Sequence, residues 1–416
     1  MRILLSAFAC EPYSGSEKSN GWTWAQALAR RHEVVVLADR AYRPAVEREL
    51  LQHPDLTGLA FEWVGEGVDH HRHLGRWRYY FRWQRLAVER AATLHENEPF
   101  DVVHHVTFGT LRIPSHLWKL GVPLLWGPIG GGESISPAFY RPPWMSTRQA
   151  AQEWARALWN AWCRRDPRVR SLVRHAEVIA VTTSETRDAL PPPLPTHVVT
   201  MPSSVLHRRD LEHVARRKAA WGAATGLRVL FVGRLVGWKG PGLALAAFAA
   251  YAVDHPDASL DLYGDGPMRG WLERRAARLE IADRVTFHGK VPREQLLAAY
   301  ASHALFLFPS MHDSSGFASL EAMAAGLPVV CLDAGGPGSA VPDNAGHKAA
   351  VASPKATVVD LCAGLTRFTA DRHAWREAST RARAHALDPA MTPDIDRMID
   401  LLYGTWQRYR QSSSIS

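Results

Sequence analysis

The chain has 416 residues, of which 46% are hydrophobic and 22% charged, values that are ordinary for a soluble globular protein with large cores. No apolar run approaches the roughly 18 residues that a membrane-spanning helix needs, and the first residues predict a strand rather than a signal peptide. The net charge of +8 favours an anionic partner such as a nucleotide or a lipid phosphate, whereas no nucleic-acid-binding motif is present.

The cysteines indicate the compartment. Cys10, Cys163, Cys331 and Cys362 lie far apart and form no CxxC pair. We therefore expect reduced structural thiols in a cytoplasmic protein, with neither zinc nor disulfides. The length alone suggests two or three domains.

Strands and helices alternate along the first half of the chain. Two glycine-containing loops follow strands: EPYSGSEKSNGW, with Gly15 and Glu17, and GPIGGGE, with Gly131. Such loops indicate a close approach of the backbone to a ligand, although a bare tight turn gives the same pattern. The expected strands are 2–8, 33–38, 59–64, 101–106, 123–126, 178–182 and 197–201, and the expected helices are 22–31, 43–51, 110–120 and 149–162.

Residues 70–95 interleave arginines with aromatic residues. One interpretation is an amphipathic helix whose aromatic residues pack on the sheet. The other interpretation is that residues 70–85 contact an anionic membrane surface or a lipid phosphate. The histidines at the start of this stretch, His70, His71 and His73, are expected in a solvated loop rather than at a metal.

The second half repeats the alternation after a Ser-, Arg- and Ala-rich stretch at 203–226. Two such series predict two doubly wound parallel α/β domains, with ligands at the carboxyl ends of the strands. A last amphipathic helix begins near Ile395, and the tail after Arg410 is expected to be disordered. The expected strands are 228–234, 259–263, 284–288, 304–308 and 329–332, and the expected helices are 241–252, 267–279, 293–302 and 320–325.

The stretch 309–331 carries the strongest chemical signal. A buried strand ends at Pro309, and a polar loop leads into a helix, where free backbone N–H groups and the positive dipole end suit an anion. Two acids, Asp313 and Glu321, flank this position, which suits a ligand with both phosphates and hydroxyls. The loop delivers Ser315, Gly316, Phe317 and Ala318 to the helix N-terminus.

Three motifs in this half, taken together, resemble the retaining GT-B glycosyltransferases of family 4, the glycosyl transferases group 1. They are FVGRLVGWKG with Arg234 and Lys239, YGDGPMRGWLE with Gly264, and the acid-x7-acid pattern from Asp313 to Glu321. Asp313 stands where the family usually has Glu. In the first half, the family often has two histidines separated by one residue, whereas His104 and His105 are adjacent here.

The resemblance implies roles for these residues. Arg234, Lys239, Asp313 and His105 would be catalytic: the two cations stabilise the leaving diphosphate, Asp313 accepts from sugar hydroxyls and His105 orients the sugar or the acceptor hydroxyl. Glu321 would accept from the ribose. The base would be held by backbone at Lys290 and Val291. The implied donor-binding set is Gly15, Arg234, Lys239, Gly264, Lys290, Val291, Asp313, Gly316, Phe317, Ala318 and Glu321, and the acceptor-binding set is Glu17, His104, His105 and Gly131.

The resemblance also implies an activity: transfer of a sugar from a nucleotide diphosphate sugar to a glycan or lipid-linked hydroxyl, with retention, without metal or cofactor, for cell-surface polysaccharide or glycolipid synthesis. Attack from the front face is favoured over a double displacement through Asp313. A sugar-nucleotide epimerase and a non-catalytic nucleotide-binding protein are the alternatives.

The expected architecture is GT-B: a Rossmann-like acceptor domain at 1–203 and a donor domain at 204–388 facing a cleft, with a helix and tail at 389–416 packing back on the first domain. Residues 70–85 would place the protein at the inner face of the membrane.

Overall fold

The computed structural model describes residues 1–13, 16–67, 76–194, 197–205, 208–216, 227–392 and 394–413. Contacts divide the chain into two compact units. The first comprises Met1–Gly132, Asn160–Val205 and Pro393–Ser416, and the second comprises Glu133–Trp159 and Leu206–Thr392.

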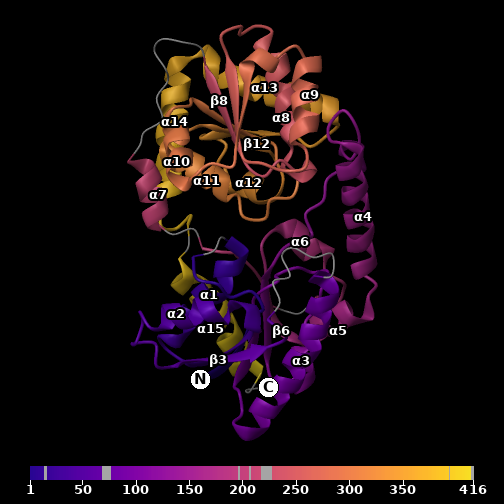
Figure 1. The fold of residues 1–416 in the computed structure, drawn as a ribbon, viewed down its shortest axis with the longest axis vertical. Coiled ribbons are helices and arrows are strands. Elements are labelled where there is room, and N and C mark those ends of the chain that lie inside the picture. The colour runs from indigo at the N-terminus through magenta and orange to yellow at the C-terminus, as the bar shows by residue number, and fades with distance from the viewer. Residues whose placement is uncertain are drawn as a thin grey trace. The chain divides into compact units, whose positions relative to one another are not determined.

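The first unit is built on a seven-stranded parallel sheet with the order β3-β2-β1-β4-β5-β6-β7 (Figure 1). The order reverses between β1 and β4, which are direct neighbours. The strands are β1 (Arg2–Ser6), β2 (Glu33–Asp39), β3 (Leu59–Val64), β4 (Val102–His105), β5 (Leu124–Ile129), β6 (Ala176–Val181) and β7 (Val198–Thr200); the helices are α1 (Ser16–Ala29), α2 (Arg43–Leu50), α3 (Arg76–Asn97), α5 (Pro167–His175), α6 (Ser184–Ala189) and α15 (Ile395–Ser413).

The central strands are apolar on both faces because helices cover both sides of a parallel sheet. All of β4 and β5 is buried. On one side, α3 inserts Tyr80 and Trp83, which are completely buried. Burying a large apolar side chain stabilises a fold by roughly 1.5–3 kcal/mol. The aromatic residues of 70–95 that the structure describes thus favour the packing interpretation of this helix.

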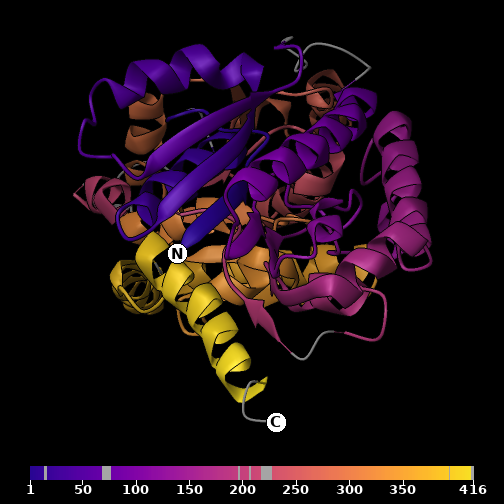
Figure 2. The ribbon, with the colours of Figure 1, turned by 90° about the horizontal axis from the view of Figure 1, so that it is seen from below.

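The last helix, α15, packs back on the first unit, as predicted. It lies against α1 and β6, and the hydroxyl of its Tyr403 is 3.1 Å from His104 Nδ1 (Figure 2, yellow helix). Trp406 Nε1 donates to Glu177 at 2.6 Å. Contrary to the expected tail, α15 continues to Ser413.

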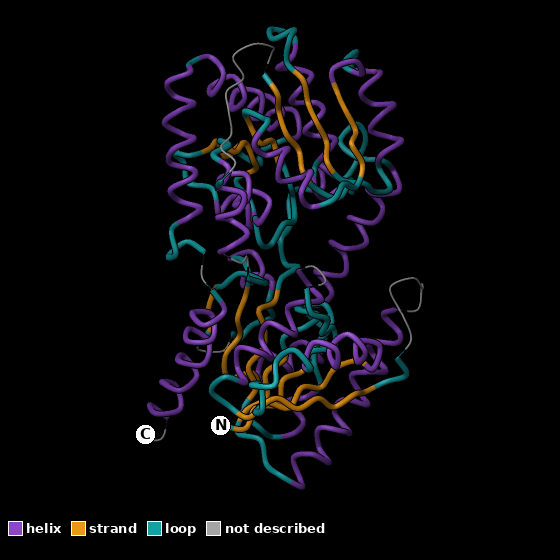
Figure 3. The backbone as a smooth tube through the Cα atoms, turned by 60° about the vertical axis from the view of Figure 1, so that its left-hand side comes forward, coloured by secondary structure: helices purple, strands orange, loops and turns teal. Residues whose placement is uncertain are grey.

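The second unit is built on a six-stranded parallel sheet with the order β10-β9-β8-β11-β12-β13 (Figure 3, strands in orange). Here the order reverses between β8 and β11. The strands are β8 (Arg228–Val232), β9 (Ser259–Tyr263), β10 (Val285–Gly289), β11 (Leu305–Phe308), β12 (Val329–Leu332) and β13 (Gly346–Ala349); the helices are α7 (Arg208–Ala215), α8 (Pro241–Ala252), α9 (Arg269–Arg278), α10 (Arg293–Ala301), α11 (Phe317–Ala325), α12 (Gly335–Ala340), α13 (Pro354–Ala370) and α14 (Arg372–Leu387).

Residues 133–159 belong to the second unit by their contacts, which differs from the continuous ranges predicted from the sequence. The physical reason is apolar packing: Phe139, Tyr140 and Met145 are buried in the same core cluster as β8 and β11. Most of helix α4 (Thr147–Cys163) lies within this segment, and only its last residues, from Asn160, group with the first unit.

The sequence located most elements but missed some. The helix expected at 110–120 is only a short 3-10 turn, Leu117–Leu120, preceded by irregular backbone. Helix α1 begins at Ser16, before the expected start at Trp22. The unpredicted elements are β13, α5, α6, α7, α12, α13 and α14.

Candidate functional site

The site is built at the strand-order reversal of the second sheet. In doubly wound sheets, ligands bind outside the carboxyl ends of the strands at this reversal. The loop after β8 carries Arg234 and a short 3-10 turn, Gly237–Lys239, and the loop after the neighbouring β11 carries Asp313. Residues 74 positions apart therefore meet at one edge of the sheet.

Lys239 and Asp313 form a largely buried ion pair. The ammonium group also lies 4.6 Å from the centroid of the Trp238 ring and 5.1 Å from that of Phe308, within the range of cation–π attraction. Burial by itself raises the pKa of Asp313, but Lys239 and two backbone amides outweigh it, so the pKa of this carboxyl lies below its ordinary value. The pair thus presents a fixed cation beside a fixed anion.

The two amides come from the loop itself. Ser315 N and Gly316 N donate to Asp313 Oδ1 at 3.0 and 2.9 Å. The N–H groups at this helix N-terminus were expected to be free for an anionic ligand. For Ser315 and Gly316 that expectation is wrong, because the aspartate side chain folds back onto them. Gly316 has φ +63°, and a Cβ there would lie 2.8 Å from the Gly336 carbonyl oxygen, so the turn requires glycine.

Glu321 is held by side chains that sequence reasoning missed. Its Oε1 accepts from Arg293 at 2.5 Å, and its Oε2 accepts from the Tyr300 hydroxyl at 3.0 Å. Burial and then the neighbouring carboxylate raise the pKa of Tyr300 well above its usual value, so the phenol stays a donor. A ribose at Glu321 would have to share this carboxylate with Arg293. No fixed spacing in the sequence announces such a pairing.

Other expected donor-binding residues lie at the same edge of the sheet. Arg234 is exposed, and no acidic side chain pairs with it in the described part of the chain. A Cβ at Gly264 would lie 2.0 Å from the Gly233 carbonyl oxygen, so the backbones after β8 and β9 can approach only because this residue is glycine. Lys290 is exposed and Val291 half-buried, directly after β10. Phe317 and Ala318, both half-buried, open α11.

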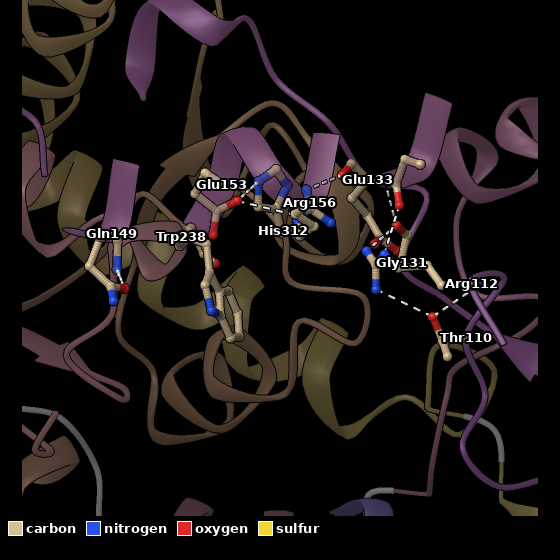
Figure 4. Close-up of polar contacts among 12 residues, drawn as sticks. Thr110, Arg112, Gly131, Glu133, Gln149, Glu153, Arg156, Trp238 and His312 are labelled. Carbon is tan, nitrogen blue, oxygen red and sulfur yellow. Dashed lines mark hydrogen bonds and ion pairs between the residues drawn. The ribbon is translucent and has the colours of Figure 1, made fainter. Parts of the chain in front are cut away.

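Helix α4 holds both loops of the site, a contribution that the sequence did not reveal. Gln149 Oε1 accepts from Gly237 N at 2.8 Å, in the turn that bears Lys239. Glu153 Oε2 lies 2.9 Å from Nε2 of His312, the residue before Asp313 (Figure 4). Both acceptors are at most 5% exposed. Burial raises the pKa of Glu153, but His312 and Arg156 outweigh it, so Glu153 is ionised at neutral pH.

At the corresponding edge of the first sheet, His104 and His105 are completely buried. His104 Nε2 lies 2.8 Å from the Gly127 carbonyl oxygen, and His105 Nδ1 lies 2.9 Å from Ser6 Oγ. Burial lowers the pKa of His104 to about 4 and that of His105 to about 3, so both imidazoles are neutral at pH 7. Neither histidine, as it lies, can touch an acceptor or a sugar, because both faces of β4 are covered.

The remaining acceptor-side expectations are partly outside the described residues. Gly15 is not described, and of Glu17 only the backbone, in α1, is described. The carbonyl oxygen of Gly131 accepts from Arg112 at 2.7 Å and from Asn160 at 2.9 Å (Figure 4), so internal hydrogen bonds hold this loop.

The described residues form neither a metal site nor a membrane-spanning helix. No group of His, Cys, Asp or Glu among them is suited to a metal ion. None of the helices formed by these residues is both long and apolar enough to cross a bilayer.

Comparison with known families agrees with this geometry. Residues 217–385, which include Arg234, Lys239, Asp313 and Glu321, match the family model described as Glycosyl transferases group 1. This part of the chain is thus similar to the glycosyl transferases group 1. A curated relative, the D-inositol 3-phosphate glycosyltransferase of Nocardia farcinica, is 34% identical over 186 residues. That match covers 41% of this chain and only 39% of the relative.

Solved structures match over the whole chain. Sucrose-phosphate synthase from Thermosynechococcus elongatus has a TM-score of 0.62 at 18% identity, with 100% of both chains covered. Anabaena HepE in complex with UDP-glucose has a TM-score of 0.58 at 17% identity, covering 98% of this chain and 100% of that one. At such identities the likeness establishes the fold, which is GT-B with two Rossmann-like units.

Proposed function

We propose that this protein is a glycosyltransferase that moves a sugar from a nucleotide diphosphate sugar, such as a GDP- or UDP-sugar, to a hydroxyl of a glycan or lipid-linked acceptor, with retention of configuration. The observation that carries the proposal is the Lys239–Asp313 pair at the β8/β11 reversal, in the part of the chain that is similar to the glycosyl transferases group 1. The UDP-glucose complex of the HepE structure supports a nucleotide sugar as the donor class.

The cations at this edge have a direct chemical use. When the sugar leaves, the diphosphate gains negative charge, and Lys239 together with the exposed Arg234 would stabilise it. We propose that these two cations take the place of a metal ion. In the retaining reaction, the leaving phosphate oxygen would take the proton of the acceptor hydroxyl as the hydroxyl attacks from the same face.

Asp313 fits a binding role better than a nucleophilic one. Its carboxylate already accepts from Lys239, Ser315 N and Gly316 N. Three donors lower the basicity of a carboxylate and fix its position, which disfavours attack on a sugar carbon. We therefore favour front-face transfer over a double displacement through Asp313, and we assign Asp313 to the hydroxyls of the donor sugar.

The test is product analysis with a panel of GDP-, UDP- and ADP-sugars and a cell-lipid extract as acceptor. A product heavier by one sugar, with the anomeric configuration of the donor and unchanged yield in EDTA, is expected. An altered sugar nucleotide formed without acceptor would indicate an epimerase instead. Tight nucleotide binding without any product would indicate a non-catalytic protein. Synthesis of a cell-surface polysaccharide or glycolipid on the cytoplasmic side is the role we propose for the product.

A further inference from the structure

An apolar stripe runs along the outward face of α4. Three large side chains at positions i, i+4 and i+8 are exposed: Trp154 by 47%, Leu158 by 67% and Trp162 by 50%. Single exposed apolar residues are common on protein surfaces, as Leu51, Val253 and Val359 are here. Three large apolar side chains on one face of one helix, two of them tryptophans, are not explained by chance exposure. The opposite face of α4 is the one that packs against the protein, since Gln149, Glu153 and Cys163 on it are buried.

The charges around the stripe are of one sign. Between 141 and 175 the only acids are Glu153 and Asp166, and both are buried, at 4% and 1% exposure. Every exposed arginine or acid of this stretch is therefore an arginine, and Arg168 contacts Trp162 of the stripe. The exposed arginines of the stretch are Arg141, Arg148, Arg164, Arg165, Arg168, Arg170 and Arg174.

A cavity of about 530 Å³ in the first unit adjoins the end of this surface. Arg168 lines it and also lies 5.7 Å from the centroid of the Trp162 ring. Arg85 from α3 and Lys119 from the 3-10 turn 117–120 line it too, around His116. Arg168 is paired with Asp166, but no acid among the described residues pairs with Arg85 or Lys119. Glu89 also lines the cavity, so its charged lining is three basic side chains and one acid. This excess of positive charge suits a phosphate group.

We propose that the outward face of α4, with the arginines that surround it, docks the protein on an anionic lipid bilayer. The two indoles and Leu158 enter the boundary between head groups and acyl chains, where tryptophan is favoured. The arginines contact anionic head groups, and the cavity beside Arg168 receives a lipid phosphate. We assign the membrane contact to α4. Tyr80 and Trp83 of α3 are buried and cannot take part, and the start of the expected stretch 70–85 lies outside the described residues.

The first test is sedimentation with vesicles of phosphatidylcholine alone or mixed with phosphatidylglycerol. The protein is expected to bind only the mixed vesicles, and salt should weaken this binding. The triple substitution Trp154→Ala, Leu158→Ala and Trp162→Ala should weaken it at least about tenfold. The control removes three apolar side chains elsewhere that are even more exposed: Leu51→Ala, Val253→Ala and Val359→Ala.

The charge is tested separately. Arg164→Gln with Arg165→Gln should weaken binding to the mixed vesicles about tenfold at low salt. Arg372→Gln with Arg376→Gln, an equally exposed pair on α14, should leave binding unchanged. Circular dichroism of every variant establishes that it is folded.

A local probe gives the position of the helix directly. The labelled variant combines Leu158→Cys with Cys362→Ser. Because Cys10, Cys163 and Cys331 are buried, the introduced cysteine is then the one exposed thiol. An environment-sensitive dye there should shift to the blue on mixed vesicles, whereas the same dye at Leu51→Cys should not.

The proposal is overturned if the intact protein does not bind the mixed vesicles at low salt, or if the triple variant binds them as well as the control variant does. It is also overturned if the stripe instead joins two copies, which light scattering would report as a dimer that the triple variant dissociates. Vesicle binding requires no sugar transfer, so these outcomes are independent of the proposed activity.

Discussion

The two sheets of this protein have the same kind of strand-order reversal, but the polar residues at the two reversals differ in type and in exposure. Next to β8 and β11, the reversal carries the charged pair Lys239–Asp313 and the exposed Arg234. Next to β1 and β4, it carries His104 and His105, both without any exposed surface. Polar residues at a reversal are therefore not sufficient to make a site; their side chains must also reach the ligand.

The difference has a simple cause. Lys239 and Asp313 follow the ends of their strands and lie in loops, whereas His104 and His105 are the last residues of β4 itself. A residue within a central strand points into one of the two covered faces. Residues in the loops beyond the strands are not confined to these faces: Arg234 is exposed and Lys239 is partly exposed, although Asp313 beside it is buried.

Lys239→Ala is expected to lower turnover about 10²–10³-fold, because removing one preorganised group that stabilises developing charge commonly costs this much. The measurement is sugar transfer with saturating donor, on protein shown to be folded. Lys355→Ala, which removes an exposed lysine from α13, is the matched control and should leave turnover unchanged. Equal activity of both variants would remove the charged pair from the mechanism.

Asp313→Asn is expected to lower turnover more than tenfold, since it leaves the Lys239 ammonium group buried without its counter-charge. Asp313→Glu keeps the charge and adds one methylene, so its loss should be smaller and should fall mainly on KM for the donor. If Asp313→Glu were the more damaging change, the carboxylate position and not its charge would dominate.

The buried histidines predict an acid-sensitive fold. In the unfolded chain a histidine has a pKa of about 6.5, but in the folded protein the values are about 4 for His104 and about 3 for His105. Between these values the unfolded state binds more protons, so the free energy of unfolding falls as the pH drops from 6.5 towards 4. His104 contributes at most roughly 3 kcal/mol to this fall.

This effect is measured as the thermal midpoint against pH. His104→Gln should flatten the dependence between pH 6.5 and 4, whereas His373→Gln, at a side chain that is 79% exposed, should not. An unchanged slope in His104→Gln would mean that the imidazole is solvated and that the first reversal is more open than we describe.

Glu153→Gln is expected to have the smallest effect, a rise of a few-fold in KM for the donor with little change in kcat. The substitution removes the charge that faces His312 and so loosens the loop that bears Asp313. Glu377→Gln, on the exposed surface of α14, is the control. A change in kcat alone would instead mean that Glu153 acts on the chemical step.

The order of strands and helices, the two doubly wound series and the residue types of the donor site were accessible from the sequence, because they depend on local periodicity and on motifs close in the chain. The pairing of Glu321 with Arg293 and Tyr300 was not, because nothing local fixes which side chains meet across two helices. The same holds for Gln149 and Glu153, which come from a segment expected in the other domain.

The sequence by itself indicated that Asp313 and Glu321 would flank one helix N-terminus, because a strand end, a polar loop and a run of helix formers follow one another there. The place of Lys239 beside them came from the family resemblance. Only the tertiary structure decided which polar groups are available. It closed two loop amides onto Asp313, covered both histidines of β4 and left Trp154 and Trp162 of α4 exposed. Exposure depends on what packs against an element, and residues far away in the chain supply that packing.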